Sequence, residues 1–172
     1  MTELLELQLV KQYPEILQEY KGDPRQTCMA FGIECADGWY QLLYTGMKRL
    51  QRIAAASGVQ TVATQIKEKY GTLRFYYTTV CDPTTTPQTI SKRANTLITK
   101  VIDTMEEESG KTCEVTGKPG KTTARGQWLR TLCEEEAKKD GYSTEAWRQE
   151  REAQEVKKTL MEAQTTKKLE LY

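Results

Sequence analysis

The chain has 172 residues, of which 38% are hydrophobic and 28% charged, and this length is enough for one domain with a core of its own. Its formal net charge of +1 argues against a partner held by charge across the whole surface, such as duplex DNA. No apolar run approaches the roughly 18 residues of a membrane span, and no secretory signal pattern opens the sequence. We therefore expect a cytoplasmic protein that binds no membrane.

The chain has no histidine and five cysteines. The lack of histidine removes the most common general base, the usual partner of a nucleophilic serine or cysteine, and the commonest metal ligand. An odd number of cysteines without a secretion signal favours reduced thiols over a disulfide framework. No glycine-rich phosphate loop of the G-x-x-x-x-G-K-[ST] or G-x-G-x-x-G type is present. We expect that the protein is not an enzyme and carries no cofactor.

The N-terminal segment carries an apolar stripe at helical spacing over residues 2–20. Pro14 interrupts this stripe, so we expect one helix that ends near Gln12 and a second that begins at Pro14. The following stretch, 27–36, predicts a compact loop or a short strand.

A long amphipathic helix is predicted over residues 38–57. Asp37 is a good residue for its N-cap, and Gly58 ends it. Gly46 lowers the helix propensity by about 1 kcal/mol, which suggests a close crossing with another element at that point.

Two alternating runs on either side of Tyr70-Gly71 predict an antiparallel hairpin over residues 59–79. Period-two alternation rich in β-branched and aromatic residues is typical of strands that are buried on one face only. The apolar face carries Ile66, Leu73, Phe75 and Tyr77, and the polar face carries Lys67, Lys69 and Arg74.

A second long helix is predicted from Pro87 to Glu108, with Thr86 as its cap. Three consecutive acids in its last turn oppose the helix dipole, so we expect that end to fray. Residues 111–132 then form a short module with a strand at 128–132, and a brief helix follows.

A long, mostly polar helix is predicted beyond Ser143. Such a helix is either a solvated arm or an interaction surface. The candidates for partner contact are its only sizeable apolar residues, Trp147, Val156, Leu160 and Met161.

The spacing of Cys113-x-x-Thr116 and Cys133-x-x-Glu136 resembles two zinc-ligand pairs in which one ligand of each pair has been replaced. The order of turn, strand and helix is that of a treble-clef zinc module. We expect buried free thiols in a degenerate, metal-free module. The alternative is a hybrid zinc site formed by Cys113, Cys133 and Glu136.

Cys28 and Cys35 precede the 38–57 helix without a histidine or a second cysteine pair nearby. Cysteine is among the most buried residue types, so we expect both in the core. The alternative is a catalytic thiolate at Cys35, because the pKa of a thiol falls at a helix N-terminus.

Three motifs carry a family resemblance: TCMAFGIECADGWY at 27–40, IKEKYGTLRFYY at 66–77, and CEVTGKPG with WLRTLC within 113–133. Together they resemble a widespread family of small phage and prophage proteins of uncharacterised function. Its members typically read C-G-D-G-W, then V-K-E-K-F-G-x-L-R-F-Y, then C-x-x-C followed by G-W-L-x-T-L-C-x-x-H. The similarity spans about 13–141 and keeps the same order.

The chain departs from that family at Ala36, where the family has glycine, and at Thr116 and Glu136, where two metal ligands would lie. The resemblance therefore implies a phage origin and a fold, but it brings no activity and no assured metal.

Basic and aromatic residues gather in the hairpin and in the segment 111–130. Charge combined with stacking suits phosphate or single-stranded nucleic acid, whereas a solvated sheet face and a basic loop explain the same residues equally well. The candidates are Lys67, Lys69, Arg74 and Tyr76, with Tyr70 beside them, and Lys118, Lys121, Arg125, Trp128 and Arg130.

These patterns predict an α+β fold with three parts. Residues 1–110 form a core in which two long helices cover a hairpin or small sheet, and strands of the next part are candidates to extend it. Residues 111–141 form the degenerate treble-clef-like module, packed on that core, and 142–172 form a helical extension.

The function that we favour is a non-enzymatic binding protein, encoded by a phage or prophage, that acts in the host cytoplasm. It would modulate or inhibit a host protein, for example in a defence system. The alternative is binding of nucleic acid or a nucleotide ligand through the basic and aromatic candidates. A thiol-dependent enzyme ranks last.

Overall fold

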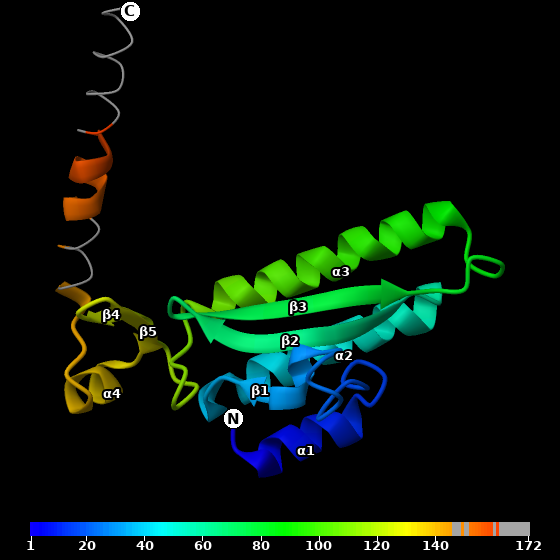
Figure 1. Cartoon of the computed structure of the whole chain (residues 1–172), viewed down its shortest axis with the longest axis horizontal. Coiled ribbons are helices and arrows are strands. Elements are labelled where there is room, and N and C mark those ends of the chain that lie inside the picture. The colour runs from blue at the N-terminus through cyan, green and yellow to red at the C-terminus, as the bar shows by residue number, and fades with distance from the viewer. Residues whose placement is uncertain (146–148, 150–151, 160, 162–172) are drawn as a thin grey trace, which may run out of the picture.

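The structure, a computed structural model, describes residues 1–145, 149, 152–159 and 161 (Figure 1). Helices and strands are both present, and the predicted α+β class is confirmed. The elements are α1 (Glu3–Gln12), η1 (Cys28–Phe31), β1 (Ile33–Glu34), η2 (Asp37–Trp39), α2 (Tyr40–Ser57), β2 (Gln60–Lys69), β3 (Thr72–Val80), α3 (Gln88–Ser109), β4 (Lys121–Arg125), β5 (Trp128–Leu132) and α4 (Glu134–Lys139).

The predicted hairpin is present and is formed by the two longest strands, β2 and β3. β2 and β3 pair antiparallel, with Lys69 opposite Thr72. The two turn residues, Tyr70 and Gly71, both have positive φ values, 54° and 80°. A two-residue turn of this handedness matches the right-handed twist of paired strands, which explains the sharp reversal at this point.

The third strand of this sheet comes from an unexpected place. β1 pairs in parallel with β2, with Ile33 opposite Ile66, so the strand order is β1-β2-β3. The expectation that the C-terminal module extends the sheet is wrong, because β4 and β5 form a separate two-stranded sheet.

The two long helices pack on the sheet and on each other, α2 against β2 and α3 against β3 (Figure 1). Ile66, Leu73 and Phe75 lie buried in the shared core, as predicted. The close crossing at Gly46 is confirmed, because a Cβ at this position would lie 1.8 Å from Sδ of Met105 in α3.

Two predictions near the N-terminus are wrong. Residues 14–21 form turns instead of a second helix. Ile16 and Leu17 are buried, and the Ile16 carbonyl accepts from Ala63 N of the sheet at 2.8 Å. The Asp37 carboxylate is not the cap of α2. It accepts from Thr2 N at 2.7 Å and so connects α1 to the segment before α2.

The ends of α3 also differ from the prediction. The N-cap is Pro87 and not Thr86, and the helix continues through its acidic last turn to Ser109. The acids of that turn have a nearby cation, which offsets their unfavourable interaction with the helix dipole. Lys111 Nζ lies 2.8 Å from a Glu107 oxygen and 3.0 Å from a Glu108 oxygen.

The module with β4, β5 and α4 is attached at the start of α2. Gly38 N donates to the Glu114 carbonyl at 2.7 Å, and the Trp39 indole Nε1 donates to the Thr112 carbonyl at 2.8 Å. The Glu114 carboxylate accepts from Ala36 N at 3.1 Å. These bonds explain why the D-G-W motif and the C-E-V-T motif belong together although they lie more than 70 residues apart.

No helix within the described residues has the length and apolar character needed to cross a membrane. Of the four predicted contact residues in the C-terminal helix, Trp147 and Leu160 lie outside the described residues. Residues 152–159 are helical, and Val156 and Met161 are exposed.

The tight contact at Gly38 generates a stability prediction. A Cβ here would lie 2.3 Å from the Cys113 carbonyl oxygen and 2.5 Å from Gly117 N, both backbone atoms that cannot turn away. Gly38→Ala should therefore lower the free energy of unfolding by about 1–3 kcal/mol, as overpacking does. Urea unfolding followed by circular dichroism measures this change.

Gly110→Ala is the matched control, because Gly110 has a φ of −70° and its added Cβ would meet atoms no closer than 3.4 Å. We expect this control to change the free energy of unfolding by less than about 0.5 kcal/mol. Equal effects of the two substitutions would contradict the packing account of the D-G-W motif.

Candidate functional site

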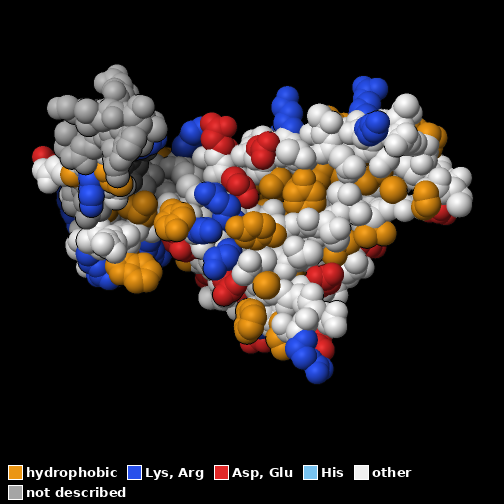
Figure 2. All heavy atoms as spheres, turned by 45° about the horizontal axis from the view of Figure 1, so that its top comes forward, with side chains coloured by type: hydrophobic (Ala, Val, Ile, Leu, Met, Phe, Trp, Pro, Cys, Tyr) orange, Lys and Arg blue, Asp and Glu red, His pale blue; other side chains and the backbone are white. Residues whose placement is uncertain are grey.

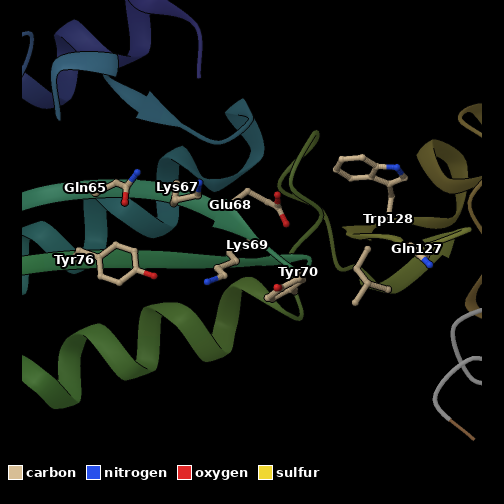
Figure 3. Close-up of a pocket in the computed structure, with 9 residues that line it drawn as sticks. Gln65, Lys67, Glu68, Lys69, Tyr70, Tyr76, Gln127 and Trp128 are labelled. Carbon is tan, nitrogen blue, oxygen red and sulfur yellow. The ribbon is translucent and has the colours of Figure 1, made fainter. Parts of the chain in front are cut away.

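A groove of about 540 Å³ opens where the hairpin turn meets the β4–β5 turn (Figure 3). Its hairpin side carries lysine and tyrosine side chains, and its module side carries an indole ring. The residues that matter for its chemistry are Gln65, Lys67, Lys69, Tyr70, Tyr76 and Trp128. The groove thus joins the predicted hairpin candidates to one predicted candidate of the module.

The hairpin turn and β5 hold this groove open between them. The Thr131 hydroxyl is buried and donates to the Gly71 carbonyl at 2.6 Å. A Cβ on Gly71 would approach the Arg130 backbone at 3.3 Å, so the turn lies directly against β5. Because the turn is fixed in this way, Trp128 at the start of β5 faces the end of β2 across the groove (Figure 3).

The aromatic residues of the groove are strongly exposed. Trp128 is 76% exposed, Tyr70 70% and Tyr76 43%. Exposed large aromatic rings that share one hollow are unusual on a protein surface, because each ring gains free energy when it is covered. The groove therefore offers flat apolar surfaces for a ligand to stack on.

The lysines of the groove make no ion pair with any described residue, so their charge is available to a ligand. Lys69 Nζ lies 5.5 Å from the centre of the Tyr70 ring, a cation–π distance. The one acid of the lining, Glu68, accepts from Gly71 N at 2.6 Å. Burial raises the pKa of Glu68 above its ordinary value, although the bond from Gly71 acts in the opposite direction.

Arg74 does not join the groove, although its neighbours on the polar face do. Its guanidinium lies 3.6 Å from Glu106 at the end of α3 and donates to the Leu73 carbonyl at 2.8 Å. The strand pattern places Arg74 opposite Lys67, but the acidic end of α3 draws its side chain away.

The cations of the predicted module patch lie apart from the groove. Arg130 pairs with Glu114 at 3.2 Å and with Asp140 at 3.5 Å, so it is a structural residue. Lys118 pairs with Glu135 at 2.9 Å. Arg130 therefore connects parts of the module, whereas Lys118 forms an exposed surface pair away from the groove.

The other two cations of that predicted patch also lie apart from the groove. Arg125 donates to the Asp140 carbonyl at 2.9 Å and lies 5.0 Å from the centre of the Tyr142 ring. Lys121 lines a separate hollow beside Cys133. Only Trp128 of the predicted module set therefore reaches the groove.

The zinc-like spacing produces a knuckle in which Cys113 and Cys133 are buried free thiols. Thr116 occupies a ligand-like place, with its hydroxyl 3.7 Å from Cys133 Sγ. Burial raises the pKa of Cys113, but hydrogen bonds from the Thr116 hydroxyl and from backbone amides outweigh it and hold that pKa below its ordinary value.

The ligand set for a metal is nevertheless incomplete. Within the part of the chain that the structure describes, no three side chains of His, Cys, Asp or Glu are placed together to hold a metal ion. Glu136 does not complete the cysteine pair, and its carboxylate lies 3.6 Å from Lys139 Nζ. The structure therefore does not bring Cys113, Cys133 and Glu136 together as a three-ligand set.

The prediction that both early cysteines are core residues is half right. Cys35 is buried, whereas Cys28 is exposed at the start of η1. Burial raises the pKa of Cys35 to about 12, which opposes the alternative of a catalytic thiolate.

A second surface was missed from the sequence. Residues 40–102 contain nine Lys or Arg and only two Asp or Glu. The helix α2 contains no Asp or Glu. On the outer side of the helix layer, apolar residues of α2 and α3 line two adjoining hollows of about 430 and 250 Å³. The signal in the sequence is the absence of acids from α2 and from α3 before Asp103, which the net charge of +1 conceals.

Figure 2 shows Lys and Arg side chains next to hydrophobic ones over the middle of one face, with Asp and Glu side chains among them, and further Lys and Arg side chains projecting from its upper edge. Comparison of the chain with family models, curated proteins and solved structures gives no match. The function is therefore inferred from the chain's own residues and contacts and from the motif resemblance given above.

The incomplete ligand set generates a prediction about metal removal. We expect the purified protein to unfold at the same temperature with and without excess EDTA, because a structural zinc would contribute directly to folding. Thermal unfolding and elemental analysis measure both quantities. Stoichiometric zinc together with a lower unfolding temperature in EDTA would contradict this prediction.

The thiol environments generate a second prediction. With a pKa of about 12, Cys35 holds roughly one thiolate in ten thousand at pH 8, and it is also sterically covered. Iodoacetamide should modify Cys28 in the native protein and leave Cys35 intact, as measured by peptide mass spectrometry. Denatured protein, in which both react, is the control, and rapid native modification of Cys35 would revive the thiol-enzyme alternative.

Proposed function

We propose that the chain is a non-enzymatic binding protein that holds a single-stranded nucleic acid in the groove at the hairpin turn. The observation that carries this proposal is the meeting of exposed Trp128, Tyr70 and Tyr76 with Lys67 and Lys69, which have no ion-pair partner among the described residues. Aromatic rings stack on bases of any sequence, and lysines contact the phosphates between them.

The size and shape of the groove support the same proposal. Its volume of about 540 Å³ lies in the range of small-ligand sites and suits a short stretch of unpaired strand or a free nucleotide. A duplex would present only phosphates and base edges, so the rings of this groove would stay uncovered. The groove therefore favours unpaired bases.

A second candidate function is supported by a different surface. We propose, as the second candidate, that the chain is of phage or prophage origin and modulates or inhibits a host protein in the cytoplasm, for example one that belongs to a defence system. The motif resemblance supports the origin. The basic and apolar outer side of α2 and α3 supports contact with a protein.

The groove proposal is tested with a fluorescein-labelled oligothymidine in an anisotropy titration at several salt concentrations. Trp128→Ala should weaken binding about fivefold to a hundredfold, since one stacked base is worth roughly 1–3 kcal/mol. Phe31→Ala is the matched control, because Phe31 is 64% exposed and lies outside the groove.

The charge arm of the same test replaces Lys67 and Lys69 together by alanine. This double variant should flatten the dependence of log K on log salt by about 0.7 for each phosphate contact that is lost. The control is the replacement of Lys92 and Lys100 of α3 by alanine, which removes the same charge elsewhere. Equal losses for both pairs would show that binding depends on net charge, and the groove proposal would fail.

A further inference from the structure

We propose that the outer side of α2 and α3 binds an acidic amphipathic helix of a partner protein. This inference rests on the second candidate function and names the chemistry of the partner segment. It starts from the two adjoining hollows between the helices, which share Arg52, Ile53 and Leu97. Because they share these residues, they form one continuous surface, called here the α2–α3 groove.

The floor of the α2–α3 groove is apolar. Ile90 is 44% exposed and Leu97 46% exposed, and Ile53 and Val101 are half-buried. The opposite sides of both helices already pack on the sheet, so this apolar surface is left over after the core is complete. The floor provides contacts for apolar side chains spaced along a partner segment.

The rim of the α2–α3 groove is basic. Arg49 and Arg52 rise from α2, and Arg93 and Lys100 from α3. All four side chains are exposed, and none forms an ion pair with a described residue. Exposed cations are normally interspersed with acids, so four cations around an apolar floor indicate a partner that supplies the carboxylates.

The dimensions of the α2–α3 groove fit a helix. The lining residues of α3 run from Ile90 to Thr104, a stretch of about 21 Å, and α2 runs beside it. A helix that lays its apolar stripe between two others uses anchors at i, i+3 or i+4 and i+7. Acids on both sides of that stripe would then face Arg49 and Arg52 on one side and Arg93 and Lys100 on the other.

The floor distinguishes this partner from other anionic ones. Phosphates of a nucleic acid would contact the rim cations and leave Ile90 and Leu97 exposed to water. A lipid surface would need apolar residues that project beyond the cations, whereas here the cations surround a hollow. An acidic amphipathic helix would cover the apolar floor with its apolar stripe and pair with the rim cations through its carboxylates.

The test uses the full chain and a fluorescein-labelled helical peptide of about 18 residues, with leucines along one stripe and glutamates on both sides of it. The control peptide has the same composition in shuffled order, so that its leucines are spread around the helix. We expect saturable binding of the patterned peptide in an anisotropy titration and at least about tenfold weaker binding of the shuffled one.

Protein variants locate the binding. Arg52→Glu should weaken binding by about fivefold or more, whereas Arg25→Glu, which changes the net charge equally at a side chain 86% exposed, should not. Leu97→Ala should weaken binding about fivefold, with Leu7→Ala as its control because Leu7 is 50% exposed on α1. Unchanged thermal unfolding of each variant confirms that the fold is retained.

Several outcomes would overturn the proposal. These are equal binding of both peptides, equal losses for Arg52→Glu and Arg25→Glu, and absence of saturable binding. Oligothymidine or anionic vesicles that displace the patterned peptide at the α2–α3 groove would also overturn it by assigning the groove to another class of partner. Trp128→Ala should leave peptide binding unchanged, which separates this surface from the groove at the hairpin turn.

Affinity capture from the bacterial host distinguishes failure of the α2–α3 groove as a binding site from failure of the host-binding function on which that inference rests. If one host protein is captured equally by the wild-type chain and by the Arg52→Glu and Leu97→Ala variants, the host-binding function stands and the α2–α3 groove is not its site. If no host protein is captured although the patterned peptide binds, the second candidate function fails while the peptide chemistry of the groove remains.

Discussion

The buried carboxylate of Glu114 connects the two parts of this structure. One oxygen accepts from Ala36 N, the other lies 3.2 Å from Arg130 Nε, and the carbonyl of the same residue accepts from Gly38 N. Breaking such a buried pair by removing one partner leaves an uncompensated charge and is strongly destabilising. The position of the module, and with it the position of Trp128 opposite the hairpin, depends on this junction.

The two proposed surfaces lie on different layers and have different chemistry. The groove at the hairpin turn combines aromatic rings with lysines at the end of the sheet, whereas the α2–α3 groove combines aliphatic side chains with a basic rim on the helix layer. Both draw their cations from residues 40–102, where acids are scarce. A protein with almost no net charge therefore presents two separate positive surfaces, because its acids are concentrated elsewhere in the chain.

The periodicity of apolar residues and the turn residues were sufficient to predict the hairpin, both long helices and the lysines that line the groove at the hairpin turn. The rest depends on contacts between distant residues. β1 has only two residues and becomes a strand because β2 offers it an edge. Trp128 reaches the groove only because Thr131 bonds to Gly71, 60 residues away, and Arg74 leaves it because Glu106 ends a helix nearby. No local pattern in the sequence signals these pairings.

The acidic last turn of α3 has an additional role at the outer edge of the sheet. Leu73 N donates to the Ser109 hydroxyl at 2.8 Å, and Phe75 N donates to the Glu106 carboxylate at 2.9 Å. These amides would otherwise be open donors on an edge strand, the feature through which sheets add foreign strands and aggregate. Along this stretch no foreign strand can pair with β3 through these two amides. Side chains of α3 thus protect the edge strand, a role that charged residues or prolines on the edge strand have in other sheets.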